Sequence, residues 1–151
     1  MSKAWGPCTW YLFHTLAEKV KEESFPTLKN GLITIIKRIC SNLPCPSCAE
    51  HARQKMDSLN VNNIRSKHDF KLMLLSFHNE VNRRLNRPEF TEQQLNEKYK
   101  LSKTHDIVQY FLQTWQKPNT NPKLLINSFH KNYIIKDFGS WINTNYIHFS
   151  P

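Results

Sequence analysis

The sequence predicts an all-α protein: a four-helix bundle with a short fifth helix, followed by a C-terminal extension that is mainly helical or irregular. Three observations support this fold class. Apolar residues recur at spacings of three and four, as on one face of a helix. Residues suited to helix starts and stops lie at the ends of these stretches. No segment of the first 85 residues has the pattern of a strand.

The first two helices are predicted from this periodicity. Residues 9–20 have an apolar face, and Thr9 is the expected N-cap. A second helix is predicted from about Pro26, a residue that a first turn tolerates, to the residues before Pro44, which blocks its continuation.

The third helix is predicted to start at Pro46 and to continue to about Leu59. This start makes Cys45 the N-cap residue and puts Cys48 in the first turn. A Cys-x-x-Cys pair is therefore expected at a helix N-terminus.

The fourth and fifth helices follow a short loop. The fourth spans residues 67–85, because Pro88 follows and the residue before a proline disfavours the helical conformation. The fifth is short, residues 91–98, and Thr91 and Gln94 have the spacing of a capping box.

The texture of the sequence changes beyond residue 100. Residues 104–115 have a helical pattern, and residues 116–123 form a turn-rich linker. The aromatic and Asn-rich remainder has no pattern that assigns one structure. We therefore expect one domain over residues 1–100 and an extension, 101–151, that packs on it or forms a dimer or partner surface.

The chain has 151 residues and a formal net charge of +9, from 21 Lys and Arg against 12 Asp and Glu. This positive charge can attract nucleic acid, acidic proteins or an anionic ligand. The basic residues form no run of five or more, which argues against nucleic acid as a main partner. Neither a signal peptide nor a membrane span is readable. Four cysteines in such a chain indicate redox or metal chemistry.

The motif Cys45-Pro46-Ser47-Cys48 allows a disulfide across one helical turn, and the helix N-terminus favours a thiolate. The same pattern occurs in thioredoxin-type sites, which need a βαβ context, and as half of a zinc site. For zinc, the further ligands would come from His51, His68, His78 or Cys40.

A dithiol that passes on two electrons needs an acceptor beside it, and a flavin can take two electrons and react with oxygen. A pocket for such a group is predicted from two helix faces. Trp10 and His14 share a face of the first helix, and His78, Asn79 and Asn82 share a face of the fourth.

Three blocks of sequence carry a family resemblance. They are WGPCTW with HTLA within residues 5–17, LPCPSCAEH at residues 43–51, and FHNEVNRRLNRPEF at residues 77–90. In order and spacing they resemble the Erv/ALR family of FAD-linked sulfhydryl oxidases. The chain looks like the short forms that large DNA viruses encode, since it lacks the additional cysteines of many cellular members.

The resemblance implies an enzyme that makes disulfide bonds in protein thiols and passes the electrons through FAD to O2, giving H2O2. Cys48 would lie against the flavin and Cys45 would exchange with substrate thiols, so these two are the expected catalytic residues. The residues expected to bind FAD are Gly6, Thr9, Trp10, His14, Cys48, His51, His78, Asn79, Val81, Asn82, Leu85 and Arg87.

The same resemblance implies partners and a location. A protein dithiol, such as a thioredoxin-like or virion protein, would be the substrate, and the enzyme would be a homodimer in the host cytoplasm or the virion.

The two remaining cysteines, Cys8 and Cys40, would form a structural disulfide or stay as two buried thiols. The alternative function is a zinc-binding or inactive interaction module on the same helical fold.

Overall fold

The structure, a computed structural model, describes residues 4–116 and 125–151, with side chains throughout except at residues 125–130. Over these ranges the chain forms seven α-helices and three short 3-10 helices, and its single β-type pairing is an isolated bridge between Val20 and Phe149. The all-α prediction is confirmed.

Helix α1 (Trp5–Lys19) is central, since it packs against α4 (Lys67–Arg84), α5 (Glu92–Lys100) and α6 (Thr104–Gln116). It begins earlier than predicted. Pro7 lies in its first turn, where a missing N–H leaves no intrahelical bond unmade. The expectation that Thr9 caps this helix is wrong, because Thr9 lies inside it.

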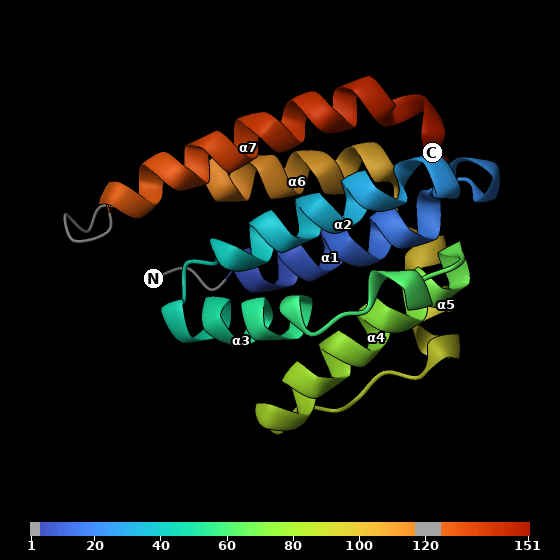
Figure 1. The fold of residues 1–151 in the computed structure, drawn as a ribbon, viewed down its shortest axis with the longest axis horizontal. Coiled ribbons are helices and arrows are strands. Elements are labelled where there is room, and N and C mark those ends of the chain that lie inside the picture. The colour runs from blue at the N-terminus through green and yellow to red at the C-terminus, as the bar shows by residue number, and fades with distance from the viewer. Residues whose placement is uncertain (1–3, 117–124) are drawn as a thin grey trace.

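Helix α2 (Phe25–Ser41) packs against α3 (Pro46–Asp57) and α7 (Leu125–Asn145). Pro26 occupies its first turn, as predicted. In Figure 1, α7 runs along one edge of the molecule above α6 and α2, and α3, α4 and α5 lie on the opposite side of α1.

The helix boundaries that depend on caps agree with the sequence. Cys45 is the N-cap of α3 and its sulfur accepts a hydrogen bond from the Cys48 N–H. Thr91 and Gln94 form a complete capping box at the start of α5. Asn86, with φ of 56°, adopts the left-handed conformation that follows many helices, and α4 ends there.

The C-terminal extension is more regular than its sequence suggested. The predicted helix at 104–115 is confirmed as α6. The predicted linker, residues 116–123, lies outside the described residues apart from Gln116, and the remainder forms the long helix α7. The end of the chain returns to α1, because Ser150 N–H donates to the Lys19 carbonyl at 2.7 Å.

Buried side chains from both parts of the chain form one apolar cluster. Leu12 and Leu16 of α1 are fully buried in it together with Trp115 of α6 and Phe138 of α7. Burial of apolar area drives folding, so α6 and α7 contribute to the same core as the bundle.

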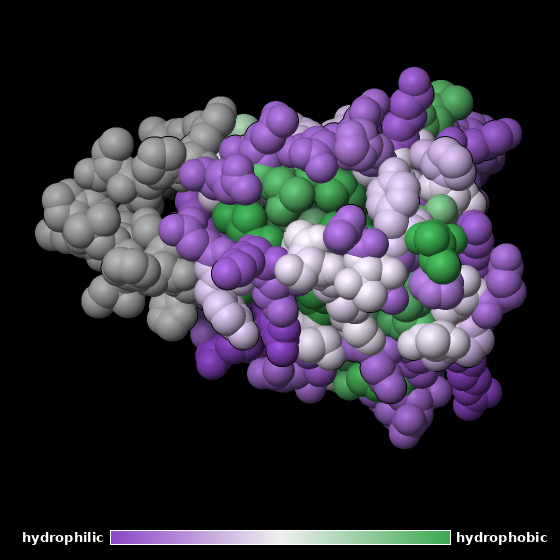
Figure 2. All heavy atoms as spheres, turned by 90° about the horizontal axis from the view of Figure 1, so that it is seen from above, coloured by the Kyte–Doolittle hydropathy of each residue, from purple (hydrophilic) through white to green (hydrophobic). Residues whose placement is uncertain are grey.

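Two properties concern the outside of the molecule. On the face covered by α7, apolar side chains come to the surface in a group framed by polar ones (Figure 2). Among the helices within the described ranges, none is both long and apolar enough to cross a membrane.

Candidate active site

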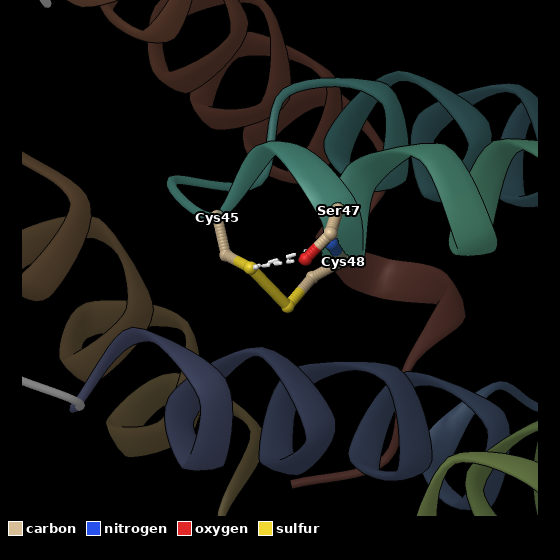
Figure 3. The surroundings of a disulfide bond; sticks show 3 residues. All are labelled: Cys45, Ser47 and Cys48. Atoms are coloured by element: carbon tan, nitrogen blue, oxygen red, sulfur yellow. Dashed lines mark hydrogen bonds between the residues drawn. A yellow bond between two sulfur atoms is a disulfide. The ribbon is translucent and has the colours of Figure 1, made fainter. Parts of the chain in front are cut away.

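The structure joins the two predicted catalytic residues in a disulfide at the start of α3. The Cα atoms of Cys45 and Cys48 are 5.2 Å apart, within the usual range for a disulfide. Both residues are partly exposed. In Figure 3 the two sulfurs point away from the ribbon of α3, toward the side on which α1 runs. The bond is thus accessible from solution at a helix N-terminus.

Local hydrogen bonds converge on one of the two sulfurs. The Sγ of Cys45 accepts from the Cys48 N–H at 3.3 Å and lies 3.3 Å from the hydroxyl of Ser47 (Figure 3). The free N–H groups of a first helical turn also give a partial positive charge. Once the disulfide is reduced, these groups favour negative charge on sulfur.

Three of the predicted cofactor residues form a layered aromatic cluster. The rings of Trp10 and His78 are stacked with centroids 4.0 Å apart and planes within 3°, and the ring of His14 lies 5.6 Å from that of Trp10 at 20°. His14 Nε2 and His78 Nδ1 are 2.8 Å apart and share a hydrogen bond. The two helix faces predicted to form a pocket do meet.

Both histidines are held in the neutral form. Burial is the main cause of the lowered pKa of His14, and the neighbouring His78 and Lys98 lower it further. Burial, with Lys98 and Arg87 nearby, lowers the pKa of His78 to about 4. At neutral pH one imidazole therefore donates in their shared hydrogen bond and the other accepts.

Two polar atoms at this cluster have no hydrogen-bond partner within the described part of the chain. They are Nδ1 of His14, within the cluster, and Nδ2 of Asn82, which lies on α4 one turn after His78; both side chains are more than nine-tenths buried. Buried polar groups are nearly always paired in native proteins, so such atoms are candidates to bond a ligand. A flavin carries ring N–H and carbonyl groups, so the free nitrogen of His14 beside flat aromatic rings and the free amide of Asn82 on the same helix as His78 fit it.

Asn79 has a different place in the site. Its Nδ2 donates to the Phe90 carbonyl at 2.8 Å and its Oδ1 accepts from the Phe90 N–H at 2.9 Å. The ring of Phe90 lies 5.3 Å from that of His78. Asn79 therefore holds the segment after α4 beside the aromatic cluster.

Lys98 and Tyr99 of α5 belong to the same neighbourhood, and the sequence did not indicate them. The Tyr99 ring lies 4.9 Å from that of His14. The Lys98 ammonium lies 4.8 Å from the centre of the Tyr11 ring and 5.3 Å from that of Phe90. Lys98 thus places a positive charge next to two neutral histidines.

The other predicted cofactor residues add no aromatic ring to this cluster in the part of the chain that the structure describes. Thr9 bonds to Trp115 on α6. The remaining ones are Gly6 in the first turn of α1, with open space where a Cβ would lie, exposed His51, half-buried Val81 and exposed Leu85 and Arg87.

Cys8 and Cys40 are two free, buried thiols, so the structural disulfide that the sequence left open is not formed. Burial raises the pKa of Cys40 to about 12, which makes this thiol a poor nucleophile. Over the described ranges, no group of three or more His, Cys, Asp or Glu residues is arranged to hold a metal ion.

Fold and site together define an all-α protein with a Cys-x-x-Cys disulfide and a buried tryptophan–histidine cluster. Residues 7–100 match the Erv1/Alr family, and the chain therefore belongs to this family. No solved structure matches the chain at a significant level.

Curated relatives include viral and plant proteins. The protein named "Putative FAD-linked sulfhydryl oxidase 347L" of Invertebrate iridescent virus 6 is 31% identical over 102 residues, which cover 64% of this chain and 92% of that protein. FAD-linked sulfhydryl oxidase ERV1 of Oryza sativa subsp. japonica is 34% identical over 62% of this chain and 48% of its own length. The FAD-linked sulfhydryl oxidase of African swine fever virus (isolate Pig/Kenya/KEN-50/1950) is 31% identical over 55% of this chain and 69% of its own length.

Proposed function

We propose that this protein is an FAD-dependent sulfhydryl oxidase that forms disulfide bonds in protein thiols and delivers the electrons to O2, giving H2O2. The observation that carries the proposal is the partly exposed Cys45–Cys48 disulfide at a helix N-terminus. Membership of the Erv1/Alr family and the names of the relatives support it.

The chain's own cysteines carry the thiol chemistry. A substrate thiolate attacks the sulfur of Cys45, the bond between Cys45 and Cys48 breaks, and Cys48 leaves as a thiolate in the first turn of α3. The second substrate thiolate then attacks the substrate sulfur of this mixed disulfide. The substrate leaves oxidised, and the cysteine pair of the enzyme holds the two electrons.

The cofactor would be FAD. When bound, FAD supplies an acceptor for the electron pair and a centre that reacts with oxygen. The stacked rings of Trp10 and His78 would stand beside it, the orphan atoms of His14 and Asn82 can hydrogen-bond to it, and Lys98 offers a charge for its phosphates. We also assign to this site Gly6, Thr9, Cys48, His51, Asn79, Val81, Leu85 and Arg87.

Residues 1–100 would carry the cofactor and the chemistry, and residues 101–151 would support them. We expect the protein to work as a homodimer. Its substrate would be a protein dithiol, and its location would be the host cytoplasm or the virion. Sedimentation of the purified protein and imaging of the tagged full chain in infected or transfected cells test these two points.

The absorbance spectrum of the purified protein, followed by oxygen uptake after addition of dithiothreitol, tests the function. The wild type is expected to show flavin bands, oxygen uptake and H2O2. Cys48→Ser is expected to lose at least about a thousandfold in turnover, because removing a nucleophile or its partner abolishes the covalent route.

Cys40→Ala is the matched control, since Cys40 is a free and buried thiol. It is expected to keep its flavin and its turnover. A colourless protein that contains zinc would contradict the proposal and favour a binding module on the same fold. A yellow protein that takes up no oxygen with dithiothreitol would contradict the oxidase activity while leaving the cofactor assignment in place.

A further inference from the structure

A groove of about 730 Å³ lies between α6 and α7, in the part of the chain beyond the family match. Its volume is in the range of about 300–1,000 Å³ that is usual for ligand sites. Four aliphatic side chains line it, of which three are almost fully buried in the core. They are Val108, Leu112, Ile135 and Ile142.

Carboxamide side chains stand along the same groove. Gln109, Gln116, Asn132 and Asn143 all line it and all are exposed. Each carboxamide can donate and accept a hydrogen bond, as a peptide group can. An apolar floor between such walls suits a polypeptide segment, which has alternating side chains and a polar backbone.

The charge along the groove is basic. Lys136 and His105 line it, and no Asp or Glu does. A second hollow, of about 420 Å³, shares His105 and Tyr146 with the first and continues it to Lys19 and Lys103. Its only acidic lining residue is Asp106.

We propose that this groove docks an acidic segment with apolar side chains, contributed by the protein whose thiols the enzyme oxidises; the inference rests on the proposed function. Charge complementarity selects this occupant, because Lys136, Lys103 and Lys19 line the two hollows and Asp106 is the one acidic side chain in their lining. A second copy of this chain would bring a net charge of +9 to a basic groove and is disfavoured.

Gly139 offers a way to fill the groove without disturbing the core. It lines the groove, and a Cβ placed on it would meet nothing within 4 Å. Gly139→Trp therefore puts an indole into the groove, and replacing a glycine inside a helix favours the helix. Lys136→Glu reverses the charge of the groove. Thr144→Trp is the matched control, since Thr144 is exposed on α7 and does not line the groove.

Fluorescence anisotropy with two labelled peptides measures docking on the full chain. In one peptide leucines alternate with aspartates, and in the other they alternate with lysines. The wild type is expected to bind the acidic peptide at least about tenfold more tightly than the basic one, and Gly139→Trp and Lys136→Glu to weaken this binding about tenfold or more. Thr144→Trp is expected to bind as the wild type does.

Kinetics connect docking with turnover. With the acidic peptide carrying a cysteine pair as substrate, Gly139→Trp is expected to raise KM about tenfold and to leave dithiothreitol turnover unchanged. Unchanged peptide affinity in both groove variants would overturn the inference. A change from dimer to monomer in Gly139→Trp would also overturn it, because the groove would then be a contact between copies. A wild type inactive on dithiothreitol would contradict the proposed function, and the anisotropy would still decide the groove.

Discussion

The indole N–H of Trp115 donates a hydrogen bond to the hydroxyl of Thr9, 3.1 Å away and 106 positions earlier in the chain. Thr9 in turn donates to the carbonyl of Trp5, and the next residue, Trp10, stacks on His78. This contact ties α6, which lies outside the family match, to α1, the helix that carries Trp10 and His14. The C-terminal extension therefore braces α1 through a buried hydrogen bond.

Trp115→Phe tests this brace. The change removes the buried N–H and part of the ring, so we expect the free energy of unfolding to fall by about 1–3 kcal/mol. Urea unfolding of the full chain measures it. Tyr133→Phe is the control, because Tyr133 is 66% exposed and its change should have almost no effect. Equal free energies of unfolding for the two variants would show that the Trp115 contact with α1 does not stabilise the protein.

The features that the sequence predicted correctly are those set by local chemistry. Cys45 caps α3 because a proline follows it at a position that favours helix starts, and Thr91 with Gln94 forms the expected capping box. The contact of Trp10 and His14 with His78 was also predictable. Helical spacing puts Trp10 and His14 on one face of α1, and the polar and aromatic side chains of α4 form the face that packs against it.

The features that the sequence missed depend on tertiary packing. Helix α7 contains Gly139 and many Asn and β-branched residues, so its local propensity is weak and its contacts with α6 and α2 stabilise it. Lys98 and Tyr99 reach the aromatic cluster because α5 packs on α1, and no spacing along the chain shows this. Thr9 was expected to cap α1 and instead bonds to α6.

A graded series at Asn79 tests its hold on the segment after α4. Asn79→Ala loses both hydrogen bonds to Phe90, and Asn79→Asp keeps the acceptor for the Phe90 N–H but sets a carboxylate against the Phe90 carbonyl. We expect losses of about 2–3 kcal/mol for Ala and about half of that or more for Asp, measured by urea unfolding. Faster amide exchange at residue 90 should accompany both. Unchanged exchange there would show that other contacts hold the segment.

The pH dependence of stability reports on the buried imidazoles. Burial, Lys98 and Arg87 lower the pKa of His78 from 6.5 to about 4, so the unfolded chain takes up the proton first as pH falls. The contribution of His78 to the free energy of unfolding is therefore most favourable above about pH 6.5. It becomes less favourable as the pH falls from there toward about 4, because protons bind preferentially to the unfolded chain.

His78→Phe keeps an aromatic ring against Trp10 and removes the titrating group. We expect its free energy of unfolding to decline less than that of the wild type across this window, by up to about 3 kcal/mol. Unfolding curves at a series of pH values give the slopes. Ile147→Thr, a change at a side chain that is 73% exposed and does not titrate, should keep the wild-type slope. Parallel slopes for the wild type and His78→Phe would contradict the buried, neutral state of His78.

The approach of α7 to α2 depends on Gly31. A Cβ at this position would lie 2.9 Å from Nε1 of Trp141, and the indole, packed against Phe149, has little room to move away. Gly31→Ala should therefore destabilise the protein by about 1 kcal/mol or more, although alanine favours a helix over glycine by about the same amount. In a Trp141→Leu background the clash is absent, and the same change should stabilise the protein by about 0.5–1 kcal/mol. Urea unfolding of the four proteins in this cycle gives the coupling energy between positions 31 and 141. If Gly31→Ala changed the free energy of unfolding with the same sign in both backgrounds, the packing of α7 on α2 would not require glycine at position 31.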